Sequence, residues 1–217
     1  MKINIQLNNV KIQRDIPVSW GEVTFDQFLN LSQANNDLSK IVSVFTGIDP
    51  ETIRKAKING FDQVKNALSF IERNDLNTTV PDSILGYKMP KNLELETIGQ
   101  WEDMKLEAQN IKDQSKESLI TFCKFCAIYA TNPYDAAKAN ELSSTFLNAP
   151  CEEVLAIGNF TLLKLIESSA NGQIKALLPN SRMRKLKLAM IAWLRRSVFT
   201  VRFYLWKRKL RIKGTSY

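Results

Sequence analysis

The chain has 217 residues, of which 44% are hydrophobic and 24% charged, and its formal net charge is +8. This length suffices for one large domain or two small ones, and the composition is ordinary for a globular protein. The absence of histidine excludes catalytic triads built on an imidazole and removes the commonest metal ligand. Three cysteines do not make a disulfide framework and fit a reducing compartment.

Residues 1–20 predict a small β-hairpin. Apolar and polar side chains alternate over Ile3–Leu7 and again over Val10–Ile16, and the Asn8-Asn9 pair between them suits a turn. This N-terminus lacks the apolar core of a signal peptide, and no run of the chain reaches the roughly 18 apolar residues of a spanning helix. We therefore expect a soluble chain that is neither exported by the usual route nor inserted into a membrane.

Residues 21–75 predict a first helical subdomain. Thr24 and Gln27 fit a capping box that begins a helix. Asp49-Pro50 begins another, with Asp as the cap and Pro in the first turn. The helix that begins at Thr24 carries a core-facing stripe at Leu38, Ile41, Val42 and Phe45, and Gly47 ends it. A later helix is predicted by Phe61, Val64, Leu68 and Ile71.

Residues 76–95 predict a loop or linker, because helical periodicity disappears there; a short strand is possible near Ile84–Met89. Residues 96–172 predict a second helical subdomain. Its helices are expected over Glu96–Lys112, Glu117–Ala130, Pro133–Leu147 and Pro150–Ala170. The fold class expected from the whole pattern is mainly α: a helical, bundle-like body preceded by a β-hairpin and followed by a long basic segment.

The candidate chemical groups of this body point to packing rather than catalysis. Cys123 and Cys126 form a C-x-x-C pair, but they lie in an apolar stretch and only Cys151 remains as a further cysteine ligand. The acidic pairs Glu102-Asp103 and Glu152-Glu153 lie near predicted helix starts, where the helix dipole favours carboxylates. We predict no enzymatic activity, no catalytic residue, no metal, no cofactor and no small-molecule substrate.

Residues 173–217 form the basic C-terminal segment. From Ser168 to the C-terminus the chain holds 13 Lys or Arg residues and no Asp or Glu, whereas the first 167 residues hold 17 basic and 22 acidic side chains. Apolar residues lie on two opposite helical faces between Ser181 and Ile212, as in a helix buried between partners. From Val198 to Trp206 the β-branched and aromatic residues suit a strand equally well.

Cations and aromatic rings alternate in this segment, which makes it the candidate contact surface. The predicted contact residues are Arg182, Arg184, Lys185, Lys187, Trp193, Arg195, Arg196, Phe199, Arg202, Trp206, Lys207, Arg208, Lys209 and Arg211. Such a pattern fits nucleic acid, with cations on phosphates and rings on unpaired bases, or a membrane surface. It fits equally a helix packed in an oligomer, its charges solvated or paired with a neighbour's acidic body.

Two stretches of the N-terminal half follow the pattern of a known family. Residues Ile16–Phe28 read IPVSWGEVTFDQF, and residues Ile41–Ile53 include FTGIDPETI. The first is similar to the opening I-P-x-x-W-x-x-(V/I)-T-x-x-Q-F, and the second to the (L/F)-T-G-I-(D/P) turn that follows it, in proteins of tailed phages of Bacteroidetes, including crAss-like phages. The chain resembles these proteins.

Three later stretches resemble the same family in the same order. They are Met89–Leu93, MPKNL; Thr97–Met104, similar to t-x-G-Q-(Y/F/W)-x-D-(L/M); and Pro150–Val154 leading into Ala156–Phe160. Together the motifs cover most of residues 16 to 166, whereas the chain after Asn171 lies outside the resemblance. Such proteins are encoded among virion and tail-assembly genes, so the resemblance implies a structural or assembly role.

The function expected is therefore that of a virion structural protein of a tailed bacteriophage, an oligomeric ring or adaptor of the neck or tail. Its expected partners are copies of itself, neighbouring virion proteins and packaged DNA. It is expected in the virion, and in the host cytoplasm during assembly. Two alternatives stay open: a tail-assembly chaperone absent from the mature particle, and a nucleic-acid-binding protein.

Overall fold

The structure, a computed structural model, is described here over residues 1–7, 10–34, 37–59, 61–73, 76–111 and 115–170. This part is mainly helical, with eight α-helices and an N-terminal β-hairpin, as the sequence predicts. None of its helices is both long enough and apolar enough to cross a bilayer.

The hairpin consists of β1 (Lys2–Leu7) and β2 (Val10–Asp15), which pair antiparallel. Alternation buries Ile3 and Ile5 on one face, and the Met1 ammonium closes the open end by donating to the carbonyl of Ile16 at 2.5 Å. A third strand, β3 (Lys57–Asn59), pairs with the other edge of β1 and gives the order β2-β1-β3. This strand has only three residues between two helices, so periodicity did not predict it.

The first group of helices begins and ends at several of the predicted signals, but the single helix predicted between Thr24 and Gly47 is two helices, because the chain turns after Leu31 and Asp37 caps a new helix. It comprises η1 (Trp20–Glu22), α1 (Phe25–Leu31), α2 (Leu38–Thr46), α3 (Pro50–Lys55), α4 (Phe61–Ala67) and η2 (Leu68–Glu72). Thr24 and Gln27 form the predicted capping box of α1. Asp49 caps α3, and Gly47, at φ 70°, ends α2 in the left-handed conformation that glycine adopts without steric cost.

The segment between the two predicted subdomains holds a second hairpin rather than a single strand. Its strands are β4 (Ser83–Ile84) and β5 (Tyr87–Lys88), joined by Leu85 and Gly86, which both have positive φ. A short helical turn, η3 (Lys91–Leu93), follows. Ile84, Met89 and Leu93 of this segment are buried in the core. The division of the chain into subdomains at 76–95 stays a prediction.

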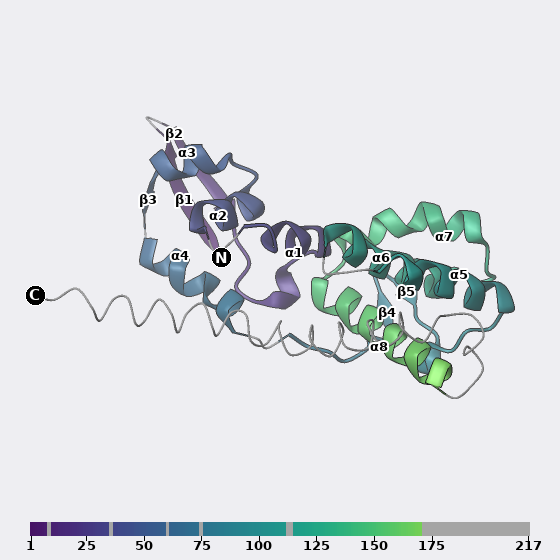
Figure 1. Cartoon of the computed structure of the whole chain (residues 1–217). Helices are drawn as coiled ribbons and strands as arrows, with labels where there is room; N and C mark the ends of the chain where they lie inside the picture. The colour runs from purple at the N-terminus through teal and green to yellow at the C-terminus, as the bar shows by residue number, and fades with distance from the viewer. Residues whose placement is uncertain (8–9, 35–36, 60, 74–75, 112–114, 171–217) are drawn as a thin grey trace, which may run out of the picture.

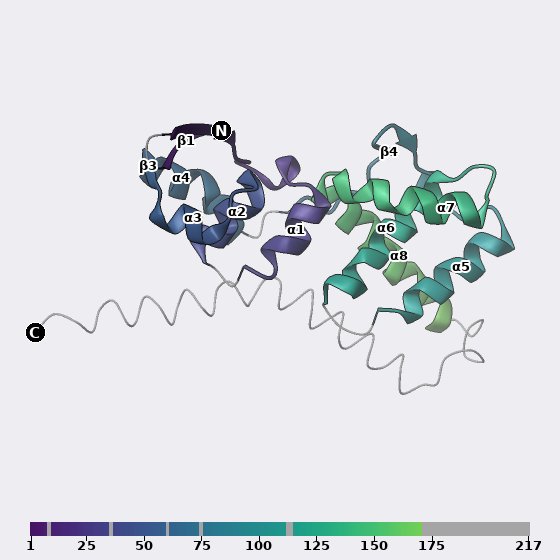
Figure 2. The ribbon, with the colours of Figure 1, turned by 90° about the horizontal axis from the view of Figure 1, so that it is seen from above.

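The second group of helices comprises α5 (Ile98–Gln109), α6 (Lys116–Ala130), α7 (Ala136–Ser143), η4 (Ser144–Asn148) and α8 (Cys151–Ala170). In Figures 1 and 2 this group and the β4–β5 hairpin lie on one side of α1, and the three-stranded sheet with α2, α3 and α4 lies on the other. Helix α1 contacts both α2 and α8.

A short antiparallel bridge attaches α1 to the start of α8. Phe25 N donates to the carbonyl of Ala149 and Cys151 N donates to the carbonyl of Val23, both at 2.8 Å. One continuous cluster of buried side chains includes members of both groups, from Ile3 of β1 to Leu162 of α8. The two groups of elements therefore share a core.

Candidate binding surface on helix α5

All fourteen predicted contact residues, from Arg182 to Arg211, lie outside the described residues. Residues 198–206, which suit a helix or a strand, lie outside them too. The candidate surface described below is formed by the helical body itself.

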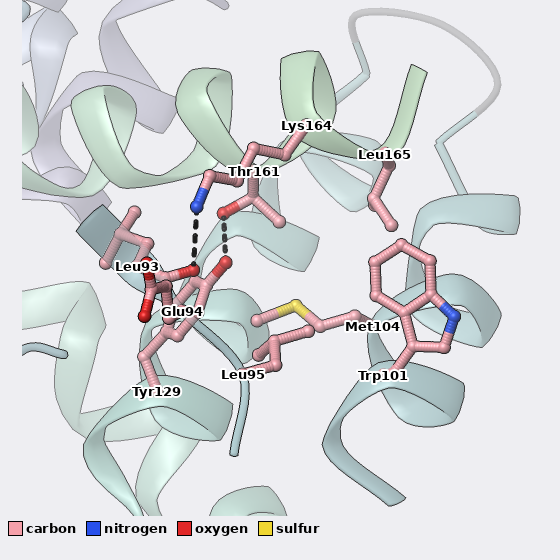
Figure 3. A pocket seen from close by; sticks show the side chains of 9 residues that line it. All are labelled: Leu93, Glu94, Leu95, Trp101, Met104, Tyr129, Thr161, Lys164 and Leu165. Atoms are coloured by element: carbon pink, nitrogen blue, oxygen red, sulfur yellow. Dashed lines mark hydrogen bonds between the residues drawn. The ribbon is translucent and has the colours of Figure 1, made fainter. Parts of the chain in front are cut away.

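A pocket of about 380 Å³ opens between α5, α6, α8 and the chain that leads into α5. Its wall is mainly apolar, with one carboxylate and one ammonium at the sides (Figure 3). The lining residues are Leu93, Glu94, Leu95, Trp101, Met104, Tyr129, Thr161, Lys164 and Leu165. Pockets that take small ligands or anchoring side chains begin at roughly 300 Å³, so this one has room for one or two large apolar groups.

Lys164 fixes one side of the pocket. Its ammonium donates to the carbonyls of Asn92 and Leu93, the latter at 3.4 Å, and lies 5.0 Å from the centroid of the Phe160 ring. Asn92 and Leu93 have φ values of 56° and 47°, a left-handed conformation that costs a residue with a Cβ roughly 1–2 kcal/mol. The ammonium offsets part of that cost and joins the turn to α8 (Figure 3).

The floor of the pocket contains a buried pair of hydroxyl groups. Thr161 Oγ1 donates to the carbonyl of Ile157 at 2.8 Å and lies 3.3 Å from the hydroxyl of Tyr129. Burial raises the pKa of Tyr129 to about 12, so its phenol stays protonated at neutral pH. These two hydroxyl groups therefore interact with each other and with the backbone of α8, and the apolar part of the pocket is formed by the side chains of Leu93, Leu95, Trp101, Met104 and Leu165.

The outer side of α5 continues the apolar surface beyond the pocket. Ile98 is 78% exposed and Leu106 is 59% exposed, and Trp101 lies one turn from Ile98 and lines the pocket. The ammonium of Lys105 lies 5.8 Å from the centroid of the Trp101 ring. Large apolar side chains exposed together on one helix mark a surface that binds a partner more often than a solvated one.

Carboxylates surround these apolar side chains. Residues 94–104 contain Glu94, Glu96, Glu102 and Asp103 and no Lys or Arg. Glu94 lines the pocket and is exposed, as is Glu102. We call the set Glu94, Ile98, Trp101, Glu102 and Leu106, together with the pocket, the α5 surface. Its chemistry is apolar and acidic, which suits an apolar and basic partner.

The cysteines are core residues, which confirms the prediction for Cys123 and Cys126 and adds Cys151. Cys123 and Cys126 of α6 and Cys151 of α8 are free and at most 1% exposed. Burial raises the pKa of Cys123 and of Cys151 to about 12, and raises that of Cys126 as well. A thiol needs its thiolate form for nucleophilic, redox or ligand chemistry, so the three side chains serve packing at neutral pH.

Of the two acidic pairs, only one begins a helix. Glu152 and Glu153 lie in the first turn of α8, and Glu152 accepts a hydrogen bond from the backbone N of Asn77 at 2.6 Å. Desolvation, and then the charge of Glu152, raise the pKa of Glu153. The prediction was wrong for Glu102-Asp103, because α5 begins at Ile98 and places this pair in its second turn, where Asp103 accepts from the hydroxyl of Tyr134.

Comparison of the chain with models of protein families, with curated proteins and with solved structures found no match. Among the residues that the structure describes, no cluster of acidic or cysteine side chains has the arrangement of a metal site. The α5 surface therefore has to be interpreted from its own residues.

Sequence reasoning missed the α5 surface, although a signal for it exists. Met104 is fully buried and Ala108 packs against the core, which places the core side of α5 opposite Ile98 and Leu106. An amphipathic helix carries polar residues on its outer side, so apolar residues there indicate contact with something else.

Proposed function

We propose that this chain is a non-enzymatic virion structural protein of a tailed bacteriophage, an oligomeric ring or adaptor of the neck or tail that acts by binding. The observation that carries the binding role is the α5 surface, where α5 exposes Ile98 and Leu106 and contributes Trp101 to a pocket that Glu94 also lines. The basic segment 173–217 carries the opposite charge, so contact between this segment and the α5 surface is chemically favourable.

The virion assignment rests on the resemblance to tailed-phage proteins, and the fold supplies physical roles for its motifs. Trp20 packs edge-on against Phe70 with ring centroids 5.2 Å apart, and its Nε1 donates to the carbonyl of Arg73 at 3.2 Å. The two T-x-x-Q stretches of the resemblance are the capping boxes of α1 and α5. Trp101 occupies the aromatic position of the motif at Thr97–Met104 and lines the pocket.

Mass spectrometry of purified virions, with copy number read against the major capsid protein, tests this proposal. We expect a stoichiometric signal near roughly six or twelve copies per particle, since a closed ring fixes the number of subunits. Abundance in infected-cell lysate with absence from mature particles would refute the structural role and favour a tail-assembly chaperone. Native mass spectrometry of the purified full chain checks independently whether it forms a closed oligomer.

Nucleic-acid binding is the second candidate, favoured by the 13 basic residues after Glu167 that alternate with aromatic rings. Phosphate contacts release counterions, so the affinity for DNA would fall steeply as salt rises. The matched test compares the full chain with the variant Lys207→Glu, Arg208→Glu, Lys209→Glu in a salt titration of DNA binding. If this charge reversal changes neither DNA affinity nor assembly, the C-terminal segment has neither role.

A further inference from the structure

We propose that the α5 surface is the docking site for residues 181–212 of the same polypeptide chain. This inference goes beyond the virion assignment and does not depend on it. It identifies what covers an apolar surface that the described part of the chain leaves exposed, and it gives the basic segment a partner inside its own molecule.

The described chain ends close to the pocket of the α5 surface. Helix α8 ends at Ala170, and two residues of its last described turns, Lys164 and Leu165, line the pocket. The segment therefore starts beside the surface that it would cover. An extended chain spans roughly 3.3–3.6 Å per residue, so the ten residues 171–180 span about 33 Å, more than the roughly 18 Å length of the 12-residue helix α5. A tether of this kind gives an effective concentration in the millimolar range.

The charges of the two parts are complementary. Residues 94–106 carry four carboxylates and one cation, Lys105, whereas the segment after Glu167 carries 13 cations and no carboxylate. Lys164, the cation that lines the pocket, is already held by the carbonyls of Asn92 and Leu93. Glu94, which lines the pocket, and Glu102, which follows Trp101 in α5, are both exposed, so the arginines of the segment would find carboxylates to pair with.

The aromatic side chains of the segment match the pocket in size. The segment places Trp193, Phe199 and Trp206 among its arginines and lysines. A large aromatic side chain fits a pocket of about 380 Å³ and would contact Trp101 and Met104, which line it. Aromatic anchors in a pocket with a charged rim are the usual arrangement of residues that dominate binding energy. The same contact removes Ile98 and Leu106 from water.

Photo-crosslinking of the full-length protein tests the proposal. The photoreactive amino acid p-benzoylphenylalanine replaces Ile98, whose side chain is 78% exposed and therefore tolerates replacement. The same amino acid at Val18, which is 40% exposed and lies near Trp20, serves as the matched control. We expect crosslinks from position 98 to peptides within 181–212, in at least tenfold greater yield than from position 18.

A mixture of isotopically light and heavy protein distinguishes the source of the segment. Crosslinked peptides that are all light or all heavy show that the segment belongs to the same chain, as proposed. Mixed pairs in the statistical proportion would overturn the proposal in favour of a segment from a second copy. The absence of crosslinks to 181–212 would overturn docking altogether, while leaving the virion copy number as a separate result.

Charge reversal tests the electrostatic part. Glu94→Lys with Glu102→Lys should reduce the crosslink yield several-fold, and the reduction should match that of wild type in roughly 1 M salt, where the Debye length is about 3 Å. Glu72→Lys with Asp15→Lys, at two exposed carboxylates outside the α5 surface, makes the same change in net charge and is the control. An unchanged yield in the double variant would show that the carboxylates of the α5 surface do not hold the segment.

Discussion

Gly158 of α8 lies against the ring of Phe122 of α6, and a Cβ at position 158 would come within 2.1 Å of Phe122 Cδ2. Helices that cross this closely bring backbone against side chain, which only glycine permits. Gly158 is buried, and α6 and α8 form the most extensive helix contact of the described part. The missing side chain therefore sets how near the two longest helices approach.

Gly158→Ala should accordingly destabilise the protein. Replacing glycine by alanine inside a helix ordinarily stabilises it by roughly 0.5–1 kcal/mol, but overpacking a core costs roughly 1–3 kcal/mol. Phe122 is only 3% exposed and has little room to move. We therefore expect the destabilisation from overpacking to exceed the stabilisation from the gain in helix propensity. Urea denaturation of the full chain measures the change in the free energy of unfolding.

Gly99→Ala is the matched control, since a Cβ there would lie 3.4 Å from Tyr134 Cε1, an ordinary van der Waals contact. It should be neutral or stabilising. Adding Phe122→Leu to Gly158→Ala should recover part of the loss, because it removes the atoms that the new methyl group meets. Equal effects of the two alanine variants would contradict the role assigned to Gly158.

The two capping boxes should differ in strength. Gln27 and Gln100 each accept from the N-cap backbone N–H, of Thr24 and Thr97, at 3.0 and 3.1 Å. Gln100 alone is buried, and its Nε2 also donates to the carbonyl of Ile128 at 3.3 Å. That carbonyl belongs to the last turn of α6, where the helix has no further N–H group to donate to it. The hydrogen bond from Gln100 therefore links the start of α5 to the end of α6.

We therefore expect Gln27→Ala to cost roughly 0.5–1 kcal/mol, the usual range for a lost cap, and Gln100→Ala to cost roughly 1–3 kcal/mol more. The larger value arises because a buried carbonyl loses its partner. Thermal or urea denaturation of the two variants provides the comparison. If Gln100→Ala lowered the free energy of unfolding no more than Gln27→Ala does, Gln100 would not link α5 to α6 as assigned.

Asp37 should make the stability of the protein depend on pH in the acid range. Hydrogen bonds from Ser39, and then the Arg54 guanidinium, lower the pKa of Asp37 to about 2. Because the folded pKa lies below the unfolded value of about 3.9, the stabilisation is complete above pH 4 and is lost as pH falls towards 2. In Arg54→Gln, an NMR titration of the Asp37 carboxyl should show a higher midpoint; an unchanged midpoint would show that the ion pair contributes nothing.

The three thiols should be unreactive in the native protein. Cys123, Cys126 and Cys151 are buried with raised pKa values, so at pH 8 almost none of each is thiolate. We expect labelling by a thiol-reactive disulfide reagent to be very slow without denaturant and to reach three thiols per chain in urea. Cys151→Ala should lower the final count by one. Rapid labelling of the native protein would show that α6 or the start of α8 opens easily.

The sequence by itself determined which segments are helices and where several of them begin or end. The signals at Thr24, Gly47 and Asp49 are local: a side chain satisfies a backbone N–H a few residues away, or a glycine adopts a positive φ. Such interactions need no partner from elsewhere in the chain, and the hairpin register of β1 and β2 follows from alternation in the same way. The burial of Cys123 and Cys126 was also predictable from local sequence, because their neighbours in α6 are apolar.

The tertiary structure alone decided what depends on distant parts of the chain. The strand β3 exists because β1 has a second edge to pair, the junction of Thr24 and Pro150 brings together residues far apart in the sequence, and Gly158 matters only because Phe122 faces it. The α5 surface is of the same kind. Whether Ile98 and Leu106 face the core or water depends on the side of α5 that packs against α6, and packing between helices is settled by the fit of whole surfaces rather than by local pattern.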